Sequence, residues 1–196
     1  EVGRLAEIKV TLKMLPITQA SKNAKTYQEA YKWGVVFNSR RHRQVLLDTV
    51  ECVNVGRTVL ILVSQIQHGL NLFQKAQLSF PDLKIHFVYG EVEAIQRATI
   101  KELLNRKTVD VVIANVVWRE GVDIPTLGAI INASGGKSEI MTLQNLGRGL
   151  RTVPGVKENV RLFDYFDPSN KYLVEHFGYR LTLYFQEGWI GGAKYD

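Results

Sequence analysis

The stretch from Val109 to Arg151 constrains the fold of this chain more than any other part of the sequence. It opens with an apolar run over 109–114, which is rich in β-branched residues and short enough to be a strand buried on both faces. A polar loop follows, and a second apolar run over 129–133 predicts another buried strand. Ser138 is then expected to begin a helix that ends near Leu150. The stretch therefore predicts two core strands and a helix.

The same alternation extends over the rest of the chain. Apolar runs at 58–63, 84–89 and 160–166 predict further strands, and segments of helical periodicity lie between them. Strands that alternate with helices of about 10 to 15 residues imply βαβ units, a mainly parallel sheet and helices on both of its faces. The expected fold class is therefore α/β.

The predicted helix that ends near Leu150 has two different faces. Its inward face is apolar, with residues at three- and four-residue spacing: Ile140, Leu143, Leu146 and Leu150. A polar face repeats at the same spacing: Gln144, Gly147, Arg148 and Arg151. Two guanidinium groups held one turn apart could grip a polyphosphate, because guanidiniums fork onto phosphate oxygens. Arginines in a last helical turn also complement the negative end of the helix dipole, so spacing alone leaves both interpretations open.

These residues resemble two motifs of superfamily 2 helicases. The pattern Gln144-x-x-Gly147-Arg148-x-x-Arg151 is similar to motif VI. The segment from Ile113 to Pro125, which contains Glu120-Gly121-Val122-Asp123-Ile124-Pro125, is similar to motif V and lies at the expected distance upstream. The resemblance covers about residues 27–189 and is nearest to the DNA helicases and translocases of phage, repair and restriction systems.

The resemblance implies the second, C-terminal lobe of a two-lobe motor. Such a lobe is a RecA-like, P-loop NTPase-type three-layer sandwich, here expected over residues 26–196, with residues 1–25 as an interlobe linker and edge strand. ATP would lie in the cleft between the lobes. The resemblance implies that Arg148 and Arg151 are the catalytic arginine fingers, and that three other residues contact the nucleotide: Gln144, Gly121 and Asp123.

Three residues at predicted strand ends are implied to contact the nucleic-acid backbone. Ser64 and Gln65 follow the strand at 58–63, in a region that resembles motif IV. Ligands of open α/β sheets bind outside the carboxyl ends of strands, although a Ser here is also an ordinary helix N-cap. Asn115 stands where many helicases have Thr, and its amide can donate the same kind of bond. Such contacts would be independent of base sequence and would weaken with salt.

The sequence contains neither Walker motif. Gly135-Gly136-Lys137-Ser138 does not complete G-x-x-x-x-G-K-[ST], because Ile131 stands where the first glycine is required. No Asp-Glu pair follows a strand to hold Mg²⁺. We therefore expect ATP and Mg²⁺ to be bound mainly by an N-terminal lobe of the same polypeptide, and this segment alone to be inactive as an ATP hydrolase.

Charge and composition narrow the class of partner. The formal net charge of +6 and the pI near 9.4 favour an anionic partner, of which nucleic acid is the commonest. DNA is expected, with RNA as the alternative. No apolar run approaches the about 20 residues of a membrane span. Cys52 is the single cysteine, which excludes a disulfide framework and a thiol pair for zinc; we expect no metal site and a cytoplasmic location, in a bacterial or phage-infected cell.

Two local patterns and two rival functions complete the expectations. The basic first turn of the helix expected over 39–53, at residues 40–43, opposes the helix dipole and predicts either a solvated surface or an anion contact. His68 is predicted to be a surface histidine.

A non-catalytic nucleic-acid-binding module derived from a helicase lobe is one rival function. A nucleotide-binding domain with a metabolic substrate is the other, and motifs V and VI argue against it.

Overall fold

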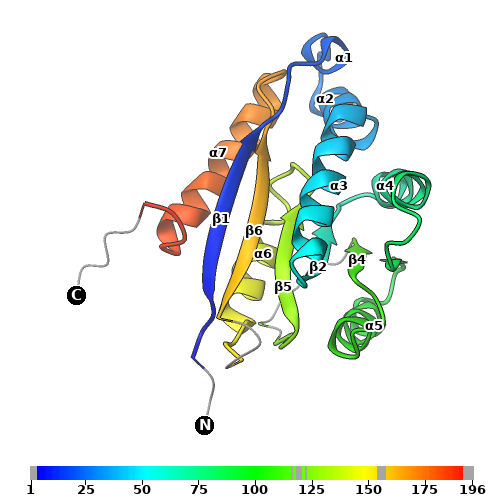
Figure 1. Cartoon of the computed structure of the whole chain (residues 1–196). Helices are drawn as coiled ribbons and strands as arrows, with labels where there is room; N and C mark the ends of the chain where they lie inside the picture. Colours follow the sequence, from blue (N-terminus) through cyan, green and yellow to red (C-terminus); the bar gives the residue numbers. More distant parts are fainter. Residues whose placement is uncertain (1–3, 116, 118–120, 122, 154–157, 192–196) are drawn as a thin grey trace.

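The computed structural model describes residues 4–115, 117, 121, 123–153 and 158–191. In this part of the chain the strands form one parallel sheet of six, in the order β1-β6-β5-β2-β4-β3 (Figure 1). The strands are β1 (Glu7–Met14), β2 (Thr58–Leu62), β3 (Ile85–Val88), β4 (Val111–Ala114), β5 (Leu127–Asn132) and β6 (Asn159–Phe166). All carboxyl ends therefore lie at one edge of the sheet, called here the carboxyl edge.

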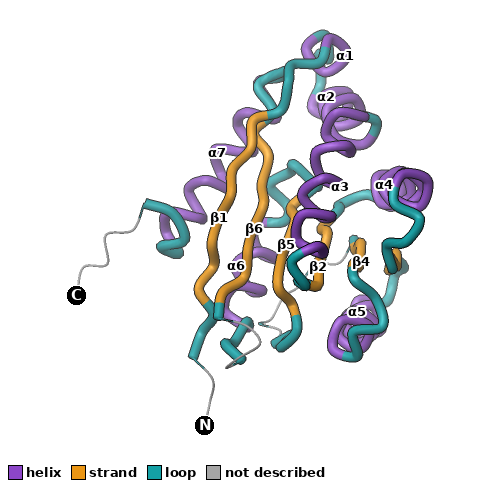
Figure 2. The backbone as a smooth tube through the Cα atoms, viewed as in Figure 1, coloured by secondary structure: helices purple, strands orange, loops and turns teal. Residues whose placement is uncertain are grey.

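Helices cover both faces of this sheet (Figure 2). They are α1 (Gln19–Lys22), α2 (Tyr27–Tyr31), the π-helix η1 (Lys32–Val36), α3 (Ser39–Asn54), α4 (Ile66–Ser79), α5 (Glu93–Asn105), α6 (Ile140–Gly149) and α7 (Lys171–Gln186). Helices α3 and α4 pack on one face, and α5, α6 and α7 pack on the other. The predicted three-layer α/β sandwich is confirmed. None of the described helices is long and apolar enough to cross a membrane.

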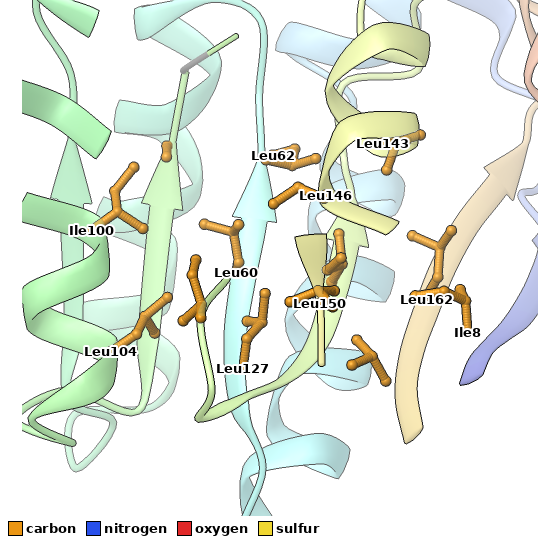
Figure 3. Packing of buried hydrophobic residues seen from close by; sticks show 14 of the residues in the cluster. Ile8, Leu60, Leu62, Ile100, Leu104, Leu127, Leu143, Leu146, Leu150 and Leu162 are labelled. Atoms are coloured by element: carbon orange, nitrogen blue, oxygen red, sulfur yellow. The ribbon is translucent and has the colours of Figure 1, made fainter. Parts of the chain in front are cut away.

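Burial on both faces explains why the core strands appear in the sequence as continuous apolar runs. Side chains of a strand alternate between the faces of the sheet. Leu60 and Leu62 of β2 pack in the cluster beneath α5, α6 and α7 (Figure 3), whereas Val59 and Ile61 pack beneath α3 and α4. Every residue of β2, β4 and β5 is buried.

The expected edge strand is present as β1. It pairs in parallel with β6 along its whole length, from Glu7 opposite Asn159 to Met14 opposite Phe166. The strand is therefore an integral part of the sheet. Its proposed role as a link to another lobe stays a prediction.

The first turn of α3 differs from the sequence-based expectation. Arg41 and His42 are buried, at 1% and 5% exposure, so a solvated surface is wrong for both; Arg40 and Arg43 are exposed. Arg41 Nε donates to the Gly34 carbonyl at 3.0 Å, and its guanidinium lies 3.7 Å from the Asp167 carboxylate. Local charge in the sequence could not reveal that η1 and the end of β6 cover this turn.

The predicted surface position of His68 is also wrong. His68 is fully buried on α4, and its ring stacks on that of His42 with centroids 5.2 Å apart. Burial lowers the pKa of His42 to about 4 and holds the pKa of His68 well below its ordinary value. Both imidazoles are therefore neutral parts of the α3–α4 contact at neutral pH.

These two histidines predict that acid destabilises the fold. The unfolded chain takes up a proton on each imidazole near pH 6.5 while the folded chain does not, so the unfolded state binds more protons below that pH. Stability should be fully present above about pH 6.5 and fall toward pH 4, with a limiting slope of about 1.4 kcal/mol per pH unit for each histidine. Urea unfolding between pH 7 and 5 measures this slope. His68→Leu should reduce it, whereas His86→Gln, at an exposed position, should not.

Candidate functional site

The polar face of α6 contacts one carboxylate at the end of α7. Gln144 Nε2 donates to Glu187 Oε1 at 2.6 Å, and Arg148 Nη2 donates to the same oxygen at 3.1 Å. Glu187 is the C-cap residue of α7. The Arg148 side chain is 60% exposed and that of Glu187 is 19% exposed. This face therefore already binds an anionic oxygen and remains open to solvent.

Gly147 lies on the same face, and Trp189 packs so closely against it that a side chain at this position would clash. A Cβ at Gly147 would lie 2.3 Å from Trp189 Cζ2. The Trp189 ring in turn stacks on Tyr184 of α7, with ring centroids 5.9 Å apart. A cavity of about 670 Å³ lies here, bordered by the start of β1, by Gly147 and Arg148, and by residues 187–189.

Arg151 lies outside the helix on which it was predicted. Helix α6 ends at Gly149, and Leu150 is extended, with φ −76° and ψ 126°. Arg151 then forms an isolated antiparallel bridge with Leu5, flanked by a hydrogen bond from Ala6 N to the Leu150 carbonyl at 3.0 Å. The predicted helical spacing of Arg148 and Arg151 is therefore wrong, because pairing with the distant N-terminal segment replaces the last turn.

Gly121, in the segment that resembles motif V, lies next to α6, the helix that carries most of motif VI. A Cβ at Gly121 would lie 3.5 Å from Gly149 Cα and 3.6 Å from the Asn145 carbonyl oxygen, which is ordinary van der Waals contact, so Gly121 lies beside the backbone of α6. Asp123 is exposed next to the buried Ile124. Residues 116, 118–120 and 122 lie outside the described residues.

The predicted nucleic-acid residues lie at the carboxyl edge. Leu62 of β2 is in register with Ala114 of β4, which brings the chain ends that carry Ser64 and Asn115 next to each other. Ser64 is exposed and shares a hydrogen bond with the Tyr31 hydroxyl, while Gln65 is the N-cap residue of α4; the alternative that Ser64 caps this helix is wrong. A groove of about 270 Å³ is lined here by Tyr27, Gln28, Tyr31, Lys32, Ser64 and Gln65.

The structure thus separates the predicted site residues into two groups. Helix α6 follows the carboxyl end of β5 and leads to the amino-terminal end of β1, so it runs back across the sheet. Ser64, Gln65 and Asn115 lie at the carboxyl edge. Gln144, Gly121 and Arg148 lie along α6, and Arg151 lies beside the start of β1. Among the described residues, no group of three or more His, Cys, Asp and Glu side chains could hold a metal ion.

The buried pair of Arg180 and Asp164 was not predicted from the sequence. Arg180 Nε and Nη2 donate to the two Asp164 oxygens at 2.7 and 3.0 Å. Arg180 Nη1 also donates to the carbonyls of Gly135 and Gly136, in the loop before α6, at 2.8 and 3.0 Å. The available signal was a lone carboxylate within the apolar run at 160–166.

Comparison with known proteins places these observations in a family. Residues 41–153 match the family model described as helicase conserved C-terminal domain. The ATP-dependent DNA helicase uvsW of Enterobacteria phage T4 is 28% identical over 173 residues, which are 86% of this chain and 34% of that protein. UvrABC system protein B of Helicobacter acinonychis (strain Sheeba) is 36% identical over 125 residues, 61% of this chain and 19% of that protein. The chain thus spans about a third or less of these relatives.

Solved structures support the fold. The crystal structure of T4 UvsW superposes with a TM-score of 0.70 and 20% identity, over 93% of this chain and 40% of that one. The C-terminal domain of the Sulfolobus solfataricus SWI2/SNF2 ATPase superposes with a TM-score of 0.59 and 11% identity, over 92% of this chain and 87% of that domain.

Breaking the buried pair should destabilise the chain strongly. Arg180→Met leaves Asp164 buried without its partner, which typically costs about 3 to 5 kcal/mol. The matched control is Arg161→Met, which removes a partly exposed pair with Glu51 and should cost about 1 kcal/mol or less. Urea unfolding measures both, and equal losses for the two variants would contradict the assignment.

Replacing two helical glycines with alanine should change the free energy of unfolding in opposite directions. Gly147→Ala should cost about 1 to 3 kcal/mol because the added methyl overlaps Trp189. Gly178→Ala on α7 meets nothing within 4 Å and should gain up to about 1 kcal/mol from helix propensity. In a Trp189→Ala background the cost of Gly147→Ala should disappear. A cost that persists there would mean that Trp189 is not the obstacle.

Proposed function

Because the chain belongs to the helicase conserved C-terminal domain family, we propose that it is the second motor lobe of an ATP-dependent DNA helicase or translocase. In this proposal residues 26–196 form the lobe and residues 1–25 lead from a first lobe. The lobe supplies arginine fingers to ATP in the interlobe cleft and grips the nucleic-acid backbone. The observation that carries the nucleotide role is the contact of Gln144 and Arg148 with one oxygen of Glu187.

That contact supports the proposed role, because Gln144 and Arg148 both donate to an anionic oxygen. The Glu187 carboxylate offers the kind of acceptor that a phosphate offers, and Arg148 is exposed enough to exchange one for the other. Arg148 and Arg151 would stabilise charge on the transferring phosphoryl group, a contribution of roughly 10³ to 10⁵ in rate. Gln144 would position the nucleotide. Gly121 and Asp123 would approach it from the adjoining loop.

The ligands of Mg²⁺ would come from the first lobe. Mg²⁺ is usually held through one or two carboxylates together with phosphate oxygens, and the sequence has no Asp-Glu pair after a strand to supply them. The magnesium ion would supply neutralisation of phosphate charge, while this lobe would supply the guanidiniums. Each lobe would then complete the site of the other.

The nucleic-acid role is supported by the carboxyl edge. Ser64 and Gln65 are exposed beside a groove that contains Lys32, and Asn115 follows the neighbouring strand β4. Hydroxyl, amide and ammonium groups all donate to phosphate oxygens. We propose that this edge contacts the backbone of DNA without reading its sequence, as suits a motor that moves along its track.

The finger role predicts a specific kinetic defect. In the polypeptide that carries both lobes, Arg148→Ala should lower DNA-stimulated ATP turnover by about 10³-fold or more and leave DNA affinity unchanged. Ser64→Ala combined with Gln65→Ala should instead weaken DNA binding. Arg106→Ala removes an exposed arginine paired with Glu102 on α5 and is the control that should change neither.

The alternatives give different results in the same assays. Full ATP turnover by Arg148→Ala would exclude it as a finger. A two-lobe protein that binds DNA but hydrolyses no ATP would favour the non-catalytic module. ATP turnover by the 196-residue chain alone would contradict the division of the site between two lobes.

A further inference from the structure

Two aromatic rings are exposed at η1, that of Trp33 within the π-helix and that of Phe37 at its C-cap. Trp33 is 42% exposed and Phe37 is 47% exposed, and their ring centroids lie 5.9 Å apart at an interplanar angle of 47°. Among the described residues, neither ring belongs to a core cluster. Aromatic side chains contribute most when they are buried, so two neighbouring exposed rings form an apolar surface that the fold itself does not use.

The backbone beneath these rings is firmly held. Gly34 faces inward, where a Cβ would lie 2.4 Å from Leu173 Cδ1, and Val35 and Val36 are buried. The Gly34 carbonyl accepts hydrogen bonds from Asn38 Nδ2 and Arg41 Nε, each at 3.0 Å. The rings therefore project from a π-helix turn whose neighbours are fixed in the core, and such turns are frequent at functional sites.

Lys32 joins the aromatic pair to the groove at the carboxyl edge. Its Nζ atom lies 4.9 Å from the centroid of the Trp33 ring, and the same residue lines the groove with Ser64 and Gln65. The described lining of that groove contains one cation and no carboxylate. A nucleic-acid strand whose phosphates lie in this groove would therefore pass the ring of Trp33.

We propose that Trp33 and Phe37 form a stacking surface for the bases of single-stranded nucleic acid, whose phosphates lie along Lys32, Ser64 and Gln65. This inference rests on the proposed backbone role of Ser64 and Gln65. Stacking on an aromatic ring tolerates every base, as a translocating motor requires. It requires unpaired bases, so this surface selects a single strand over a duplex.

The test compares strands that differ only in their bases. Fluorescence anisotropy would measure binding of the 196-residue chain to a labelled thymidine oligonucleotide, to an abasic strand of the same length, and to a blunt duplex at one salt concentration. Trp33→Ala should bind the thymidine strand about 10-fold more weakly, and Phe37→Ala should also weaken it. Neither should change affinity for the abasic strand. Trp33→Tyr, which keeps a ring, should retain most of the binding.

The control and the contrary outcomes separate this inference from the proposed function. Phe185→Ala removes a ring that is 57% exposed in the last turn of α7, and it should leave all three affinities unchanged. The stacking surface is refuted if Trp33→Ala binds the thymidine strand as tightly as the parent chain does. It is also refuted if Trp33→Ala loses as much affinity for the abasic strand as for the thymidine strand. Binding that still depends on Ser64 and Gln65 would then leave the backbone role intact. If the parent chain binds none of the three ligands, both proposals fail.

Discussion

The buried ion pair of Arg180 and Asp164 is the interaction on which the arrangement of this lobe depends. Every hydrogen-bonding nitrogen of the guanidinium has an acceptor, on Asp164 or on the carbonyls of Gly135, Gly136 and Tyr165. Asp164 also accepts from the Tyr184 hydroxyl at 2.5 Å. Charges removed from water are tolerated only when they are satisfied in this way. The pair thereby fixes α7 to β6 and to the loop that leads into α6.

That position lets α7 hold α6 at two points. Near its start, the loop carbonyls bind Arg180; near its end, Glu187 and Trp189 contact Arg148 and Gly147. The two contacts differ in energy, because an ion pair as exposed as that of Arg148 is worth about 0 to 1 kcal/mol. The buried contact is therefore structural, while the exposed one can be exchanged for another anion at little cost. In the proposed motor, this difference would suit a guanidinium that is ordered without a ligand and released to one.

The positions of the core strands, and their burial on both faces, could be predicted from the sequence because each core strand is a continuous apolar run. The motifs were also within reach, since each is local. Contacts between distant segments were not: Arg151 leaves the helix to pair with Leu5, and Arg41 is covered by η1 and Asp167. Glu187 caps α7, and nothing local in the sequence predicted its contact with Gln144. Helical periodicity places residues on a face but does not show what meets that face.

The loop of motif V connects the two groups of site residues. It begins at Asn115, beside the motif IV strand at the carboxyl edge, and it reaches the backbone of α6 at Gly121. A Cβ built at Gly121 would be in ordinary van der Waals contact with Gly149 and with the Asn145 carbonyl, so Gly121 lies beside the α6 backbone. In the proposed motor, the same contact would relate the grip on the strand to the position of the arginine finger.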